Sequence, residues 1–546
     1  MVYRRILLRV VIAAVAGTIA GCAAPKKITT EKPAPQPAAP PSAQSAVQPA
    51  PIPAPLPSAV PSAAGLPLVP ETPPDAPLHL SVAYPVPGQL IQKVDSNFIF
   101  GSVGNGNALL KIDGFPVPLA KNGAFLAFLP MPAGDKYRLV AERGINRDSM
   151  TLAYRSPKQE EPPKKNIRDK DFEPQYAKII KGSDTLQTGN DVAPGALVPD
   201  GNREWFFPRG TMLNLTEHEG KYYKVELDKN TFAWVADSNF ELKVGQSGQG
   251  GTSVSLVPSV HYVDFALPCH YNPFQIATEG TSIRIHLYGA TKPESFNTTT
   301  NDPLIDRFKY DSTSGGVDFT VFLTKRVWGY KVFYKQDGSL DVRVRRPPTI
   351  DPNNPLKGIR IMLDPGHPPG GAIGPTGLME REANLAVAEK VRDQLTQKGA
   401  QVLMTHETLS GMVSDVNQTE ELQARSAFGV QSNVDLMVSI HNNAFPDGTN
   451  PFLKYGTSTY YYQSFSAPLA EDLDKEIAPV TSIPNLGAKV KSLAVCRPTW
   501  MPCALTESLY LMFPDQENAL RDPAFLDRLA AAHVRGIEDF LRERAQ

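Results

Sequence analysis

The sequence is poor in several features that mark whole classes of protein. It holds only 4 cysteines in 546 residues and no CxxC pair, which argues against a disulfide framework and against a cysteine zinc site. Its 55 basic and 56 acidic residues nearly cancel, and no dense basic run follows the extreme N-terminus, so nucleic acid is not an expected partner. The 52 prolines come without a Gly-X-Y period and therefore indicate extended linkers rather than fibrous structure.

The chain also lacks an apolar run of membrane-spanning length. Arg4, Arg5 and Arg9 surround the start of an apolar stretch at residues 6–20, which is too short for a comfortable span and typical of a signal peptide. This signal peptide is predicted at residues 1–21, and its end, Ile-Ala-Gly-Cys, resembles the lipobox of bacterial lipoproteins. The resemblance implies lipid attachment to the thiol of Cys22 and hence a membrane partner. Ordinary secretion with an incidental cysteine is the alternative.

A tether is predicted at residues 22–77, which are rich in proline, alanine, serine and glutamine and almost free of aromatic residues. Such a composition buries too little apolar area to offset chain entropy. In polyproline II geometry, about fifty residues reach about 150 Å. Ala23 and Ala24 stand where an aspartate would retain a lipoprotein at the inner membrane, so the resemblance implies an outer-membrane anchor with the protein in the periplasm of the cell envelope.

Three β-rich modules are predicted next. Residues 78–155 alternate apolar stretches such as FIFGSV with Gly, Asn and Pro turns, which indicates an immunoglobulin-like β-sandwich. Residues 172–245, with YYKVEL and TFAWVAD, resemble an SH3-like bacterial barrel, a family that often binds peptides or cell wall. Residues 252–347, with TSIRIHLYG and VDFTVFLT, resemble an AMIN-like envelope domain. Three histidines in this last module lack a carboxylate or cysteine at ligand spacing and are interpreted as structural or exposed: His261, His270 and His286.

The character of the sequence changes at residues 357–546, where apolar strands alternate with amphipathic helices. This alternation predicts an α/β domain with a mostly parallel twisted sheet flanked by helices. A helix is expected at residues 384–398 because apolar residues recur on one helical face before a terminating glycine. A second is expected at about residues 419–431, and a last one near the C-terminus. The whole chain is therefore predicted to be multidomain.

Two histidines end strands of this predicted sheet. GIRIML leads into DPGH, ending at His367, and DLMVSIH ends at His441. Open α/β sheets build their sites at the carboxyl ends of strands. One such histidine is more often structural, but two of them with Glu380 offer two imidazoles and a carboxylate, a set that leaves zinc an open position for water.

Five motifs in order, LDPGH, GLMEREANLA, SIHNNA, GTSTYYY and MPCALTES, closely resemble the zinc-dependent N-acetylmuramoyl-L-alanine amidases of the type-3 family. The resemblance implies peptidoglycan as substrate, Zn²⁺ as cofactor, His367, Glu380 and His441 as its ligands, and Glu507 as the catalytic glutamate. Glu382 is the competing ligand choice. Fourteen residues separate His441 from Gly456, too few for the long autoinhibitory helix of some relatives, so no such self-block is expected. Cell-envelope regulatory proteins are further candidate partners.

The chemistry of amide hydrolysis fits these roles. Zinc polarises the poorly electrophilic carbonyl and lowers the pKa of its bound water to about 7. A carboxylate outside the ligand set must then accept the proton and pass it to the leaving amine. Glu507 interrupts an apolar run in which an unpaired charge would be costly, which favours a functional role over that of a solvated strand end.

Departures from the family pattern border these motifs. Pro368 and Pro369 replace the usual glycines after the first histidine, and Ser-Leu-Tyr replaces a Gly-Phe element after Glu507. Two other functions are kept open: a zinc peptidase acting within the stem peptide, and a wall-binding lipoprotein with a decayed site. Retention of two histidines and two glutamates argues against decay. Cys496 and Cys503 form a disulfide or remain free buried thiols, and Cys269 has no evident partner.

Overall fold

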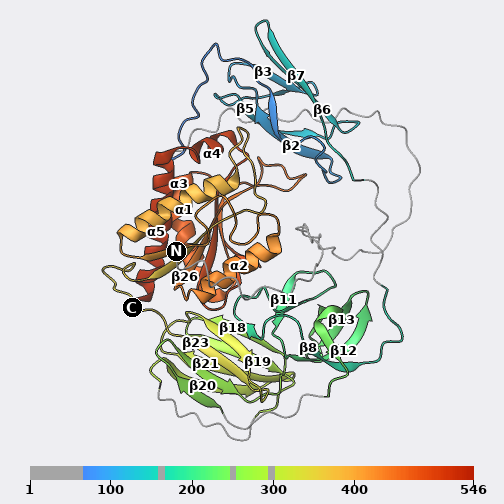
Figure 1. Cartoon of the computed structure of the whole chain (residues 1–546), viewed down its shortest axis with the longest axis vertical. Coiled ribbons are helices and arrows are strands. Elements are labelled where there is room, and N and C mark those ends of the chain that lie inside the picture. Colours follow the sequence, from blue (N-terminus) through green and yellow to red (C-terminus); the bar gives the residue numbers. More distant parts are fainter. Residues whose placement is uncertain (1–64, 158–166, 246–253, 293–301, 546) are drawn as a thin grey trace, which may run out of the picture. The chain divides into compact units, whose positions relative to one another are not determined.

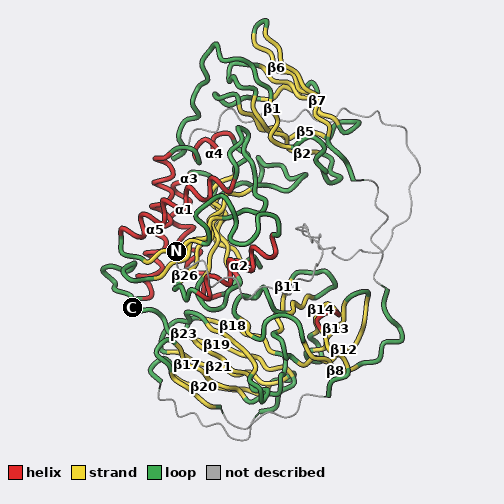
Figure 2. Tube along the Cα trace, viewed as in Figure 1, coloured by secondary structure: helices red, strands yellow, loops and turns green. Residues whose placement is uncertain are grey.

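The computed structural model describes residues 65–157, 167–245, 254–292 and 302–545, and Figure 1 and Figure 2 trace their course. The signal peptide, Cys22 and most of the predicted tether lie outside these residues. Among the helices that are described, none is both long enough and apolar enough to span a bilayer.

The first β module consists of two antiparallel sheets, with strand orders β1-β2-β5 and β4-β3-β6-β7. Alternation along the strands turns one set of side chains inward, and Ile99, Phe125 and Leu139 are fully buried there. Two such sheets are what a β-sandwich requires, while the immunoglobulin-like assignment stays a prediction. The strands are β1 (Ser81–Tyr84), β2 (Ser96–Ser102), β3 (Leu109–Ile112), β4 (Phe115–Val117), β5 (Ala124–Pro130), β6 (Lys136–Arg143) and β7 (Asn146–Ala153).

The second module is a single antiparallel sheet of seven strands in the order β11-β10-β14-β13-β12-β8-β15. Leu215, Val225 and Val235 are fully buried against it, so part of its apolar content serves as core. Its elements are β8 (Gln175–Ile179), β10 (Ala193–Ala196), β11 (Arg203–Phe207), β12 (Met212–Glu219), β13 (Tyr222–Glu226), β14 (Phe232–Ala236), the short helix η2 (Asp237–Asn239) and β15 (Phe240–Leu242).

The third module again has two antiparallel sheets, β16-β17-β23-β22-β9 and β18-β19-β21-β20. Its first sheet includes β9 (Thr185–Leu186), which comes from the preceding segment and pairs with β22. The remaining strands are β16 (Ser255–Pro258), β17 (Tyr262–Leu267), β18 (Phe274–Glu279), β19 (Ser282–Tyr288), β20 (Ile305–Ser312), β21 (Gly316–Leu323), β22 (Tyr330–Tyr334) and β23 (Leu340–Arg345).

The C-terminal domain is built on a six-stranded sheet of order β25-β24-β26-β29-β27-β28. All its neighbouring pairs are parallel except β27 with β29, which confirms the predicted mostly parallel α/β fold. Because β27 runs backwards, its first residues lie at the edge where the parallel strands end. The strands are β24 (Arg360–Pro365), β25 (Gln401–Met404), β26 (Leu436–Asn443), β27 (Thr457–Tyr461), β28 (Asn485–Val490) and β29 (Cys503–Tyr510).

Helices cover both faces of this sheet (Figure 1). Three of them, α1, α3 and α5, share one apolar core, and α2 packs with the core on the other face. The helices are α1 (Glu380–Gln397), α2 (Gln418–Gln431), α3 (Ala467–Thr481), α4 (Pro514–Ala519), α5 (Pro523–Arg544) and the short η3 (Ser464–Ser466) and η4 (Ala494–Cys496).

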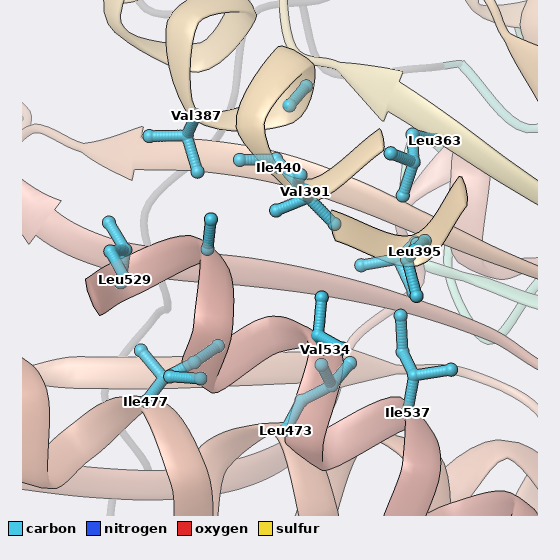
Figure 3. Packing of buried hydrophobic residues seen from close by; sticks show 14 of the residues in the cluster. Leu363, Val387, Val391, Leu395, Ile440, Leu473, Ile477, Leu529, Val534 and Ile537 are labelled. Carbon is cyan, nitrogen blue, oxygen red and sulfur yellow. The ribbon is translucent and has the colours of Figure 1, made fainter. Parts of the chain in front are cut away.

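The larger core shows why α1 docks where it does. Val387, Val391 and Leu395 recur at four-residue spacing, so they line one face of α1, and all three are fully buried (Figure 3). Each such side chain contributes about 1.5–3 kcal/mol through its burial. The helix begins at Glu380 rather than at the predicted residue 384, because the side chain of Glu382 accepts the backbone N–H of Met379 and caps its first turn.

Candidate active site

Three predicted residues converge at the carboxyl edge of the C-terminal sheet. β24 and β26 are parallel neighbours, so the turn after β24 brings His367 beside His441 near the end of β26. Glu380, the first residue of α1, lies between them: its Oε2 is 3.2 Å from Nε2 of His367, and its Oε1 is 3.1 Å from Nδ1 of His441. One ligand atom from each residue lies within 4.8 Å of the others. Together the three side chains could hold a metal ion.

The two rings are oriented by their backbone surroundings. Nδ1 of His367 lies 2.8 Å from the carbonyl oxygen of Pro369, so a neutral ring with its proton there donates to that oxygen and leaves Nε2 free as a ligand. Gly366 packs directly against His441, because a Cβ at residue 366 would stand 2.2 Å from a ring atom. Only glycine fits between the two ligands.

Glu380 is ionised and fixed. It is buried, and its Oε2 accepts the backbone N–H of Ala372 at 2.8 Å, while Asn384 Nδ2 donates to Oε1 at 3.3 Å. Burial alone would raise the pKa of this carboxyl, but hydrogen bonds from the two histidines hold the pKa well below its ordinary value. Two imidazoles and one carboxylate are a donor set that fits zinc and leaves a position for water. Glu382, the competing choice, is instead engaged at the cap of α1.

Glu507 occupies the middle of β29, opposite His441 on β26 and Ser458 on β27. Its Oε2 atom is buried and has no hydrogen-bond partner among the described residues. Burial first, and then the charge of Glu380, raise the pKa of this carboxyl well above its usual value. Glu507 is therefore a buried carboxyl with an unpaired oxygen, not a solvated strand end.

A buried polar network under the site was not predicted. Asp364, near the end of β24, accepts hydrogen bonds from Thr405 Oγ1 at 2.7 Å, Ser439 Oγ at 2.6 Å and Arg425 at 3.1 Å. Burial opposes ionisation of Asp364, but Arg425 and the two hydroxyls bring its pKa below its ordinary value. An aspartate closing an otherwise apolar strand was the available signal. A buried glutamate, Glu517, similarly holds the backbone before Glu380.

The histidines of the third module do not join His367, Glu380 and His441. Within that module, His286 meets a carboxylate from a distant part of the sequence, since its Nδ1 lies 2.6 Å from Oδ1 of Asp318. The two residues are 32 positions apart and meet because β19 pairs with β21, which spacing along the sequence does not reveal.

The three described cysteines, Cys269, Cys496 and Cys503, are free and buried. Of the two alternatives for Cys496 and Cys503, the structure therefore shows free buried thiols and not a disulfide. Burial raises the pKa of both Cys269 and Cys496 to about 12, so these thiols are inert at neutral pH.

Known proteins resemble this domain. The family model described as N-acetylmuramoyl-L-alanine amidase matches residues 361–539. The germination-specific N-acetylmuramoyl-L-alanine amidase of Bacillus subtilis is 30% identical over 203 residues, 35% of this chain and 83% of that protein. The amidase LytC of the same organism is 30% identical over 197 residues, 35% of this chain and 37% of LytC.

Among solved structures, the catalytic domain of the amidase CwlV from Bacillus (Paenibacillus) polymyxa is 30% identical. The match covers 34% of this chain and 98% of that domain, with a TM-score of 0.30. The match to the family model and the 30% identity to the germination-specific amidase show that the chain is an enzyme of the N-acetylmuramoyl-L-alanine amidase family.

Proposed function

We propose that the C-terminal domain hydrolyses the amide bond between N-acetylmuramic acid and L-alanine in peptidoglycan, with zinc held by His367, Glu380 and His441. The observation that carries the proposal is the convergence of these three side chains within 4.8 Å, with Glu507 on the adjacent strand. The names of the relatives support the choice of bond.

Zinc, when bound, supplies a polarised substrate carbonyl and an activated water. The chain supplies the proton transfers. Glu507, in its ionised form, accepts the proton of the attacking water. The same carboxyl then donates this proton to the amine nitrogen of L-alanine, which allows the amide bond to break.

Positioning of the ligands precedes this chemistry. The Ala372 N–H and Asn384 fix the Glu380 carboxylate, and the Pro369 carbonyl fixes the tautomer of His367. Because these partners are in place within the protein itself, little reorganisation accompanies metal binding.

The cellular setting is part of the proposal. Lipid attachment at Cys22 and the proline-rich tether would hold the enzyme at the outer membrane and let it reach the wall from the periplasm, for wall remodelling or daughter-cell separation. Metabolic labelling with an alkyne fatty acid tests the anchor: the parent protein should be labelled, and a Cys22→Ala variant should not. A labelled Cys22→Ala variant would contradict it.

The activity is tested with the purified protein and isolated peptidoglycan, with products identified by mass. Stem peptides beginning with L-alanine should appear, disappear on zinc chelation, return with added zinc, and be absent with Glu507→Ala. Cleavage between amino acids would instead identify a zinc peptidase. If the folded, zinc-loaded protein releases nothing, the wall-binding lipoprotein becomes the better account.

A further inference from the structure

The turn that carries His367 has few backbone N–H groups with which to form hydrogen bonds of its own. Three of the five residues from Pro365 to Pro369 are prolines, and proline has no backbone N–H to donate. His367 itself has a φ of 64°, in the left-handed region that is costly for a residue with a side chain. This conformation must therefore be imposed by its surroundings.

The surroundings hold the turn through its carbonyl oxygens. Arg425 donates from Nη1 to the carbonyl of Pro365 at 2.8 Å and from Nη2 to that of Pro368 at 2.7 Å. These two carbonyls flank the metal ligand His367. Between them, Asn384 Nδ2 donates to the Gly366 carbonyl at 3.1 Å. One guanidinium thus bridges both ends of the ligand-bearing turn.

The guanidinium is itself held from behind. Arg425 is almost fully buried in α2, and its Nε donates to Glu421 at 3.0 Å while Nη1 also reaches Asp364 at 3.1 Å. Glu421 is fixed in turn by the backbone N–H groups of Met412 and Val413. The two carboxylates compensate the buried charge, so the planar fork points to the turn in one orientation.

We infer that Arg425 is a positioning residue for the metal site, which sets the place of His367 by clamping the carbonyls on either side of it. The inference rests on the proposed zinc site and adds a residue that does not touch the metal. Lysine at this position would keep the positive charge next to Glu421 and Asp364, but all its N–H donors lie on one nitrogen, so it lacks the planar fork that reaches both Pro365 and Pro368. If Arg425 had only a structural role, its replacement by lysine would leave the zinc affinity unchanged.

The test measures zinc affinity of the full chain by competition with a chromophoric chelator, with the melting temperature of the metal-free protein recorded alongside. Arg425→Lys should bind zinc about 10-fold or more weakly, as for other partners that orient ligands. Its kcat should fall while KM for peptidoglycan stays unchanged. Arg360→Lys is the matched control, because Arg360 donates to the Ser432 carbonyl at the opposite end of β24.

Unchanged zinc affinity in a folded Arg425→Lys protein would overturn the inference, as would an equal loss in Arg360→Lys. If Arg425→Lys does not fold, Glu421→Gln serves instead: it loosens the anchor behind the guanidinium and should weaken zinc binding several-fold, and an unchanged affinity would again refute the clamp. If the parent protein binds no zinc, the proposed metal site itself is refuted. The parent therefore tests the metal site, and the variants test the role of Arg425.

Discussion

Glu380 and Glu507 are the same residue type in one site, yet they experience opposite environments. Glu380, at the start of α1, has hydrogen-bond partners on both oxygens, and its pKa lies well below the ordinary value. Glu507, in the middle of β29, has a buried oxygen without a partner, and its pKa lies well above that value. Both carboxyls are buried, so the hydrogen-bond donors around Glu380 explain why the two pKa values shift in opposite directions.

The largest expected effect comes from removing the anion. Glu380→Gln keeps the shape of the side chain but not its charge, so zinc affinity should fall by at least about 100-fold and hydrolysis should be lost with it. Metal content after dialysis measures this directly. Glu382→Gln is the control. A comparable loss of zinc in this variant would mean that Glu382, and not only Glu380, contributes to metal binding.

The contrasting change is Glu507→Gln, which removes the proposed proton carrier and leaves the three proposed zinc ligands intact. Zinc stoichiometry should stay at the parent level while kcat falls by about 10²–10⁴-fold. If this variant loses its zinc, the proposed difference between Glu380 and Glu507 is contradicted, because Glu507 would then be acting as a ligand.

A smaller effect is expected from the donors that distinguish the two glutamates. Asn384→Ala removes the hydrogen bonds to Glu380 and to the Gly366 carbonyl, so zinc affinity should fall by about 10-fold. Competition titration measures the shift. An affinity equal to that of the parent would show that the remaining donors suffice to keep Glu380 ionised and in place.

An effect of a different kind, on stability rather than on zinc binding, extends the comparison to a buried base. His533 on α5 lies beside Thr506, and burial lowers its pKa to about 4 from a reference value of 6.5. The folded state therefore disfavours protonation of His533. The resulting contribution to the free energy of unfolding is fully present above pH 6.5 and is lost as the pH falls through about 4. The total loss is about 3 kcal/mol.

Urea midpoints of the metal-free protein at pH 5 and pH 7 measure the part of this loss that falls between those two pH values. In a His533→Gln variant the difference between the two midpoints should shrink. An unchanged difference would assign the acid sensitivity to other groups.

Much of this domain could be predicted because it depends on local pattern. The apolar strands and the rule that sites form at their carboxyl ends placed His367 and His441 at one edge, and the motif order supplied Glu380 and Glu507. The helix α3 was missed: Pro468 and Pro479 interrupt its pattern, although proline is tolerated in a first helical turn, where no intrahelical N–H bond is lost. Strand β28, with a glycine in its middle, gave no strong signal either.

The support of the metal site could not be predicted for a different reason. Arg425 and Asp364 are 61 residues apart, and Arg425 occupies a helix whose sequence is mostly polar. Nothing in its neighbours along the chain distinguishes this arginine from an exposed one. Only the packing of α2 against the sheet buries it and aims it at the turn.

The reversed direction of β27 constrains how this enzyme and its relatives can diverge. β26 ends at the edge that carries His367, Glu380 and His441, and β27 begins there, so residues 444–456 leave and return at that edge. In this chain the segment contains no helix. Lengthening it would leave every strand pairing in the sheet untouched while changing what stands in front of these three side chains. A change in the length of this one connection should therefore alter access to the three side chains without disturbing the sheet.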